Sequence, residues 1–96
     1  MLNVHQLNVF VTAADTLNFT QTAKRLHLTQ SSVSQHIKSL EGQLDVNLFI
    51  RKGRTLEITD EGRVLLPMAR ELVDGSIRAT ERMEFMKKEI HGHLII

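Results

Sequence analysis

The sequence contains no cysteine, no tryptophan and no tyrosine, and its only aromatic residues besides histidine are four phenylalanines. Without cysteine, the chain can form neither disulfides nor thiolate metal sites. With so few large aromatic side chains, 96 residues build one small domain with a modest hydrophobic core. We therefore expect that contact with a second chain adds to its stability.

Long apolar runs are absent as well. No segment approaches the ~20 apolar residues that a membrane span requires. Residues 1–6 show neither the basic region nor the apolar stretch of a secretory signal. We expect a cytoplasmic protein with no membrane association. The sequence also lacks a nucleophile, base and acid in a recognisable constellation, a glycine-rich phosphate loop and a cofactor site, so we expect no enzyme and no cofactor.

Five histidines raise the question of a metal site. They are His5, His27, His36, His91 and His93. No two of them have the i, i+4 spacing of helical metal ligands, and no acidic ligand accompanies them in a tight motif. Isolated histidine pairs often occur without metal binding, so no metal is expected.

The net charge is small, but the charged residues are unevenly distributed along the chain. The formal net charge is only +1, yet residues 20–56 hold six cations and two acids, whereas residues 59–96 hold six cations and seven acids. A basic segment of this kind is the electrostatic signature of nucleic-acid binding. It lies where the next patterns place a DNA-binding surface.

The first half of the chain predicts three helices. Asn3 can cap a first helix with Gln6 at its third position, and this helix ends near Leu17. A short second helix follows, with Thr20 as its cap, and Thr29 caps a third. Their inward-facing residues recur at helical spacing: Leu7, Phe10, Val11 and Ala14; Ala23, Leu26 and Leu28; Val33, Ile37 and Leu40.

The opposite face of the third helix is almost uncharged. It carries hydrogen-bonding side chains and a single cation: Gln30, Ser31, Ser34, Gln35 and Lys38. Such a face can enter a DNA major groove without repelling phosphate, and its amides match the donor and acceptor of adenine. Taken alone, it could equally be a solvated polar surface. The following segment favours the DNA reading.

That segment predicts a β-hairpin. Core residues lead through Leu48 and Phe49 into a basic turn, residues 51–54, with a glycine at its centre, and residues 55–58 alternate with period two. Three cations at a hairpin tip have little structural use. They suit contacts with phosphate oxygens beside the helix.

These residues resemble the amino-terminal domain of the LysR-type transcriptional regulators, and the resemblance covers nearly the whole chain. The matching positions are Phe19-Thr20, Ala23, Leu26, Thr29 to Ser34, Leu40-Glu41, Leu44 to Val46, Leu48-Phe49, Arg51, Arg54 and Ile58 to Gly62. The resemblance implies a mainly α fold: a winged helix-turn-helix of three helices and a two-stranded wing, followed by a long linker helix. It also implies a dimer that binds double-stranded DNA.

Three positions depart from the family pattern. Ser31 stands where proline is usual, and serine remains compatible with a first helical turn. Gln35 stands where arginine is common, which removes a guanine or phosphate contact. Asp45 replaces the usual glycine after the recognition helix; aspartate tolerates a left-handed backbone better than most residues.

We assign DNA contacts by chemistry. Base reading is expected from Gln30, Ser34 and Gln35, because amides and hydroxyls distinguish base edges. Backbone contacts are expected from side chains that meet phosphate without discriminating sequence: Thr20, Thr29, Ser31, Lys38, Arg51, Lys52 and Arg54.

From Thr59 the pattern predicts one long helix that runs to about Ile90. Thr59 is its cap, and Asp60 and Glu61 oppose the positive end of its dipole. A helix of about 30 residues is about 45 Å long and projects beyond so small a domain. The first helix can cover the amino-terminal half of its apolar side. It cannot cover the part from Ile77 to Ile90, which needs a second chain. We therefore predict a homodimer with antiparallel or crossed helices, with an interface through Leu66, Ala69, Val73, Ile77, Thr80, Met83 and Ile90.

The predicted organisation has three parts: a DNA-binding domain at residues 1–58, a linker helix at 59–90, and at 91–96 a hinge with the first strand of a missing effector-binding domain. A small-molecule effector would bind only that missing domain, and a tetramer is open for the full-length protein. We predict a regulator that acts at an interrupted inverted-repeat operator. The alternative is a protein-interaction module that has lost DNA binding; the retained wing cations, Gln30 and Ser34 favour the regulator.

Overall fold

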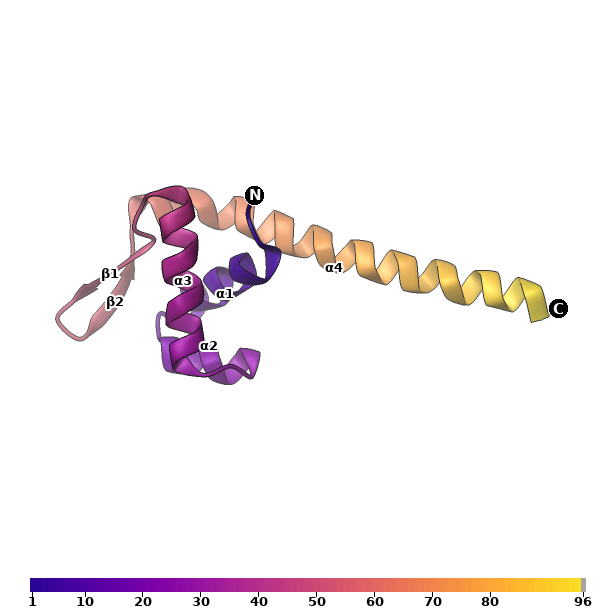
Figure 1. Ribbon diagram of the computed structural model, residues 1–96, viewed down its shortest axis with the longest axis horizontal. Coiled ribbons are helices and arrows are strands. Elements are labelled where there is room, and N and C mark those ends of the chain that lie inside the picture. Colours follow the sequence, from indigo (N-terminus) through magenta and orange to yellow (C-terminus); the bar gives the residue numbers. More distant parts are fainter. Residues whose placement is uncertain (96) are drawn as a thin grey trace.

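The computed structural model describes residues 1–95, and the side chains of residues 1–89. Four helices and a two-stranded antiparallel sheet follow in the order α1 (Val4–Thr16), α2 (Phe19–Leu26), α3 (Gln30–Leu44), β1 (Phe49–Lys52), β2 (Thr55–Ile58) and α4 (Asp60–Ile95). Figure 1 shows α1, α2 and α3 packed into a compact body, with the β1–β2 hairpin projecting at one end and α4 leaving on the other side. The predicted winged helix-turn-helix is confirmed.

Helix α1 lies at the centre of the core and contacts the other three helices. Its buried residues are Leu7, Val9, Phe10 and Ala13, whereas Val11 and Ala14 are only partly buried. All four residues of the predicted stripe therefore contact the core, two of them only in part, and Val9 is a buried residue that the stripe did not include. A single stripe was expected, but α1 is covered by partners on more than one side, so its buried surface is wider than one row of side chains.

The helix ends are determined by short-range hydrogen bonds. The side chains of Asn3 and Thr29 accept the amides of Gln6 and Ser32, which confirms both predicted caps. Helices α1, α2 and α3 each end at a residue with a left-handed backbone: Leu17, His27 and Asp45, with φ of 50°, 56° and 55°. The left-handed conformation considered for Asp45 is thus present.

The cap of α2 differs from the prediction. Asn18, and not Thr20, accepts the amide of Gln21 at 3.0 Å. Helix α2 starts two residues earlier than expected because the turn before it is tied together by the Thr16 and Thr22 hydroxyls, which lie 2.8 Å apart. Thr22 is fully buried. Thr20 therefore lies inside the first turn, where its hydroxyl is not used for capping.

The hairpin is anchored to α3 and α4 at its base. The Glu41 carboxylate accepts the amide of Leu48 at 2.7 Å, and the Thr59 amide donates to the Leu48 carbonyl at 3.0 Å. The Thr59 hydroxyl also accepts the amide of Gly62, as expected for a cap. A Cβ atom on Gly62 would lie 2.6 Å from the Leu48 carbonyl oxygen, so only glycine permits this close approach.

Helix α4 is longer than predicted. It continues past Ile90 to Ile95, with Pro67 in its second turn. Residues 91–95 are helical here, where the sequence predicts a hinge and the start of a strand, and residue 96 lies outside the described residues. The division of the chain into domains at these boundaries stays a prediction. None of the described helices combines the length and the apolar composition needed to span a bilayer.

Candidate nucleic-acid interface

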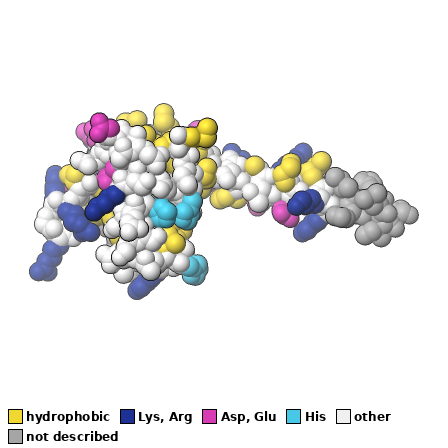
Figure 2. Space-filling model, viewed as in Figure 1, with side chains coloured by type: hydrophobic (Ala, Val, Ile, Leu, Met, Phe, Trp, Pro, Cys, Tyr) yellow, Lys and Arg dark blue, Asp and Glu magenta, His cyan; other side chains and the backbone are white. Residues whose placement is uncertain are grey.

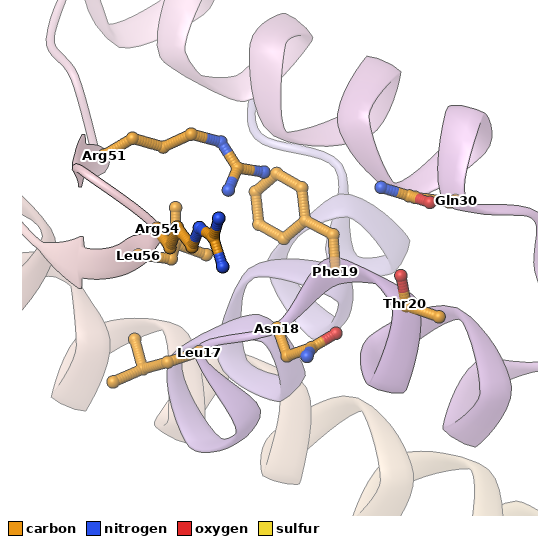
Figure 3. A pocket seen from close by; sticks show the side chains of 8 residues that line it. All are labelled: Leu17, Asn18, Phe19, Thr20, Gln30, Arg51, Arg54 and Leu56. Atoms are coloured by element: carbon orange, nitrogen blue, oxygen red, sulfur yellow. The ribbon is translucent and has the colours of Figure 1, made fainter.

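Three elements converge on one polar cavity. The start of α2, the start of α3 and the hairpin enclose about 180 Å³, lined by Leu17, Asn18, Phe19, Thr20, Gln30, Arg51, Arg54 and Leu56. In Figure 3 the two guanidinium groups, the Thr20 hydroxyl and the Gln30 amide point toward this space from three sides. Four residues assigned to DNA contacts from the sequence are thus brought together.

A second, smaller hollow lies between α3 and β1. It measures about 140 Å³, and the residues predicted to contact DNA that line it are Ser34, Lys38 and Arg51. Phe19, Arg51 and Leu56 line both hollows, so the two form neighbouring parts of one groove between α3 and the hairpin. Ser31 and Gln35 are exposed on α3 and line neither hollow.

Lys52 is directed elsewhere. Successive side chains of a strand point to opposite faces, so Lys52 and Arg51 diverge. The Lys52 ammonium pairs with Glu57 at 3.4 Å, and both residues line a hollow on the other side of the hairpin. Thr29 also has another role, because its hydroxyl oxygen accepts the Ser32 amide. Their contacts with DNA stay predictions.

Two residues of the cavity had no assigned role in the sequence. Asn18 orients the first turn of α2, and the Phe19 ring lies 6.0 Å from the Arg51 guanidinium carbon. Phe19 belongs to the Phe-Thr pair of the family pattern, so the sequence did mark this position. A phenylalanine near a core is, however, first interpreted as a packing residue. Its position beside Arg51 depends on how the hairpin folds back.

The structure also brings together His5 on α1 and His36 on α3. Their ring centroids lie 4.9 Å apart with the rings perpendicular. Figure 2 shows histidine side chains in cyan at separate places on the surface of the body. No group of three or more His, Cys, Asp or Glu side chains suited to a metal ion occurs in the part of the chain that the structure describes.

The predicted dimer residues divide into two groups. Ala69 and Val73 are only 0% and 8% exposed in the single chain, and Leu66 packs partly against the same core. Ala69 and Val73 therefore offer almost no free surface in the single chain, where α1 packs against α4. Ile77, Thr80 and Met83 are exposed, and the Ile90 side chain lies outside the described residues.

A different row of apolar and small residues runs along α4, and we call it the α4 stripe. Its members are exposed except for the half-buried Gly75: Val64, Met68, Leu72, Gly75, Ala79, Met83 and Met86. Their spacing of 4, 4, 3, 4, 4 and 3 residues repeats after 11, which keeps them on one side of a nearly straight helix. At its amino-terminal end, Val64 and Met68 border a largely apolar groove of about 420 Å³ with Leu44 and Val46.

Comparison with known proteins places this arrangement in a class. The family model described as "Bacterial regulatory helix-turn-helix protein, lysR family" matches residues 4–63. The chain is 52% identical over 68 residues to the HTH-type transcriptional regulator CitR of Bacillus subtilis, and 45% over 71 residues to the HTH-type transcriptional activator AmpR of Citrobacter freundii. These matches cover 71% and 74% of the chain but 23% and 24% of the two relatives.

Solved structures agree. The crystal structure of a CbnR_DBD–DNA complex matches with a TM-score of 0.80 and 30% identity, covering 90% of this chain and 99% of that one. The BenM_DBD/catB site 1 DNA complex matches with a TM-score of 0.74 and 28% identity, covering 94% and 97%. The fold is that of winged helix-turn-helix DNA-binding domains.

The chain belongs to the LysR family of bacterial regulatory helix-turn-helix proteins. This membership confirms the resemblance recognised in the sequence. It also confirms that the chain is not an enzyme, since its relatives are transcriptional regulators.

Proposed function

We propose that this chain is the DNA-binding and dimerisation part of a LysR-type transcriptional regulator, with α3 in the major groove and the hairpin against the adjacent backbone. The observation that carries the proposal is the convergence of Thr20, Gln30, Arg51 and Arg54 on one cavity. Figure 2 shows further Lys and Arg side chains gathered at the hairpin end of the body. The likeness to two domains solved in complex with DNA supports it.

Within this proposal the roles follow side-chain chemistry. Gln30, Ser34 and Gln35 read base edges, since amides and hydroxyls can both donate and accept. Thr20, Ser31, Lys38, Arg51 and Arg54 bind phosphates, with weaker roles for Thr29 and Lys52. Because Gln30 shares its cavity with Thr20 and both arginines, it reads a base beside a phosphate that these three residues hold.

The proposed homodimer uses the α4 stripe and not the row from Leu66 to Val73. Two copies of α4 running in opposite directions, crossing between Gly75 and Ala79, would place Met68 opposite the partner's Met86. Glu71 would then face the partner's Arg82, a contact between opposite charges that favours this direction. The groove beside Val64 would receive the far end of the partner helix, so the body also contributes to the interface.

Such a dimer defines the target. Two recognition helices related by a two-fold axis read an interrupted inverted repeat, with half-sites on one face of the duplex. The chain spans about a quarter of the length of CitR and AmpR. Binding of an effector by a further domain, tetramer formation and action in the bacterial cytoplasm are parts of the same proposal for a full-length protein.

The test begins with selection of bound sites from random duplex DNA, which yields the operator and its symmetry together. Affinity for the selected duplex is then measured by fluorescence anisotropy over a range of salt concentrations. Changing both Arg51 and Arg54 to alanine should weaken binding to all sequences. The slope of log affinity against log salt should flatten by about 2 units for each chain of the bound dimer, because each lost phosphate contact releases about one fewer counterion.

Arg78→Ala is a control for the loss of a positive charge away from the hairpin, since it removes one cation from the projecting part of α4 and should leave the slope unchanged. An unaltered slope in the double variant would show that the hairpin does not touch DNA. Failure to select any duplex would favour the alternative of a protein-interaction module.

A further inference from the structure

We propose that Phe19 is a positioning residue for DNA binding: the face of its ring holds the Arg51 guanidinium ready for a phosphate and thereby couples α2 to the hairpin. This inference rests on the proposed function. The positioning of Arg51 is a role of Phe19 that is distinct from packing in the core and from recognition of bases.

The Phe19 ring is held in place by its neighbours. It meets the Phe49 ring edge-to-face at 5.8 Å, and Phe49 contacts Phe10 in the core at 5.6 Å. Phe10 is fully buried. This chain of three rings connects the first residue of α2 with β1 and α1, so the orientation of Phe19 is determined by the core and not by solvent.

The Arg51 guanidinium carbon lies over this ring, 6.0 Å from its centroid. Figure 3 shows the Arg51 side chain crossing from the hairpin to Phe19, beside the space shared with Gln30 and Thr20. A guanidinium at this distance is attracted to the ring face. No ion pair to Arg51 occurs among the described residues, whereas Lys52, Arg63 and Arg70 each pair with a carboxylate.

The type of partner matters for DNA binding. A carboxylate would occupy the N–H groups of the guanidinium and would have to be displaced by phosphate. A ring face uses none of the five N–H donors, so the fork stays available for bidentate binding. Contact with the ring also restricts the rotamers of a long side chain before DNA arrives, which lowers the entropy lost on binding.

Arg54 provides an internal comparison. It lines the same cavity and carries the same charge, but it follows Gly53 at the hairpin tip, and the described aromatic contacts include no ring partner for it. Loss of the Phe19 ring should therefore affect binding through Arg51 and not through Arg54.

The test compares Phe19→Leu, Phe19→Met and Phe19→Tyr on the selected duplex. Leucine and methionine keep an apolar side chain against Phe49 but remove the ring. For each chain of the bound dimer they should weaken binding roughly two- to fivefold and flatten the salt slope by up to about one unit. Tyrosine keeps the ring and should bind like the wild type. Thermal unfolding followed by circular dichroism identifies variants that stay folded.

A double-mutant cycle makes the test specific. The loss caused by Phe19→Leu should disappear in an Arg51→Ala background and persist in an Arg54→Ala background. An equal loss in both backgrounds would overturn the proposal and leave Phe19 as a packing residue. If the Phe19→Leu variant does not fold, Phe19→Met replaces it in the double-mutant cycle.

One arm needs no DNA. In the NMR spectrum the ring current of Phe19 should shift the Arg51 side-chain protons, and this shift should be lost with leucine and kept with tyrosine. A wild-type protein that shows the shift but binds no DNA would refute the proposed function while supporting the contact. Absence of the shift would overturn the positioning role even if DNA binds.

Discussion

At the scale of single residues, Gln30 occupies the most informative position on α3. It is exposed at the start of the helix and faces the cavity that holds Thr20, Arg51 and Arg54. Its surroundings are therefore cationic and hydrogen-bonding, with no acidic side chain among the residues that line the cavity. A side chain so placed can read a base only if the neighbouring phosphate is held in position.

We predict that Gln30→Ala lowers discrimination at one base pair by about 1 to 3 kcal/mol, because a bidentate amide contact is lost there while the phosphate contacts remain. Competition binding against duplexes that vary one base pair at a time measures this. Gln43→Ala removes a side-chain amide of the same kind from the last turn of α3 and should leave discrimination between base pairs unchanged. Equal weakening on specific and random DNA would mean that Gln30 binds backbone.

Residue-scale features were predictable where they depend on the nearest few residues. The side chains of Asn3, Thr29 and Thr59 each accept a hydrogen bond from the backbone amide three residues later. A cap of this kind can be predicted from a few neighbouring residues in the sequence. The cap of α2 was not, because Asn18 and Thr20 are both suitable. The choice is made by the contact between the hydroxyls of Thr16 and the buried Thr22, which depends on how α1 meets α2.

At the scale of elements, the end of α3 combines two unfavourable features. Asp45 has a φ of 55°, a left-handed backbone conformation that is sterically unfavourable for a residue with a Cβ atom. Its carboxylate also lies at the negative end of the helix dipole, which is electrostatically unfavourable. Its amide donates to the Glu41 carbonyl, so the backbone of this cap is otherwise well formed. Glycine would retain the hydrogen bond and remove both penalties.

We therefore predict that Asp45→Gly stabilises the chain by about 0.5 to 1 kcal/mol, which would raise the melting temperature by several degrees for a domain of this size. Thermal unfolding by circular dichroism is the measurement. Asn47→Gly, at an exposed position two residues later without a positive φ, should not stabilise. A lower melting temperature for Asp45→Gly would show that the carboxylate makes a contact that favours the fold.

The elements themselves were predictable because each has its own period. Three helices, the hairpin and the long helix all follow from spacing and caps. The sequence could not show which side of α4 stays free, since helical spacing describes more than one apolar row. The row through Ala69 and Val73 is covered by α1, a fact of tertiary packing, and the α4 stripe is the row that remains.

At the scale of the whole molecule, the chain is strongly elongated, with extents of 64 × 24 × 18 Å. The body occupies one end, and α4 projects from it (Figure 1), with every side chain from Ser76 to Glu89 exposed in the single chain. Exposed apolar residues along a projecting helix are unfavourable in water unless another surface covers them. The dimer proposed above covers them and fixes the separation of the two recognition helices.

Changing Leu72 and Met83 to glutamate should separate the two chains. These residues are 49% and 58% exposed in the single chain, so the variant can fold, but a dimer would bring four carboxylates into its contact surface. Sedimentation should show monomers, and circular dichroism should show most helix retained. Affinity for the full inverted repeat should fall toward that of one half-site, because the second contact would no longer be intramolecular.

Ile77→Glu is the matched control for this prediction. Ile77 is similarly exposed, at 53%, but lies four residues after Val73 on the side that α1 covers, outside the α4 stripe. It should leave the dimer intact. If Ile77→Glu gave monomers while the Leu72 and Met83 variant stayed dimeric, the dimer contact would lie on the other side of α4.

The direction of the helices is tested by exchanging charges. Glu71→Arg should weaken the dimer, because in an antiparallel pair it would face the partner's Arg82, and adding Arg82→Glu should restore the attraction at both symmetric positions. Sedimentation of the single and double variants at low salt measures this coupling. If the double exchange fails to restore the dimer that Glu71→Arg weakens, the helices do not run antiparallel in the proposed register, and the spacing of half-sites must be set by another contact.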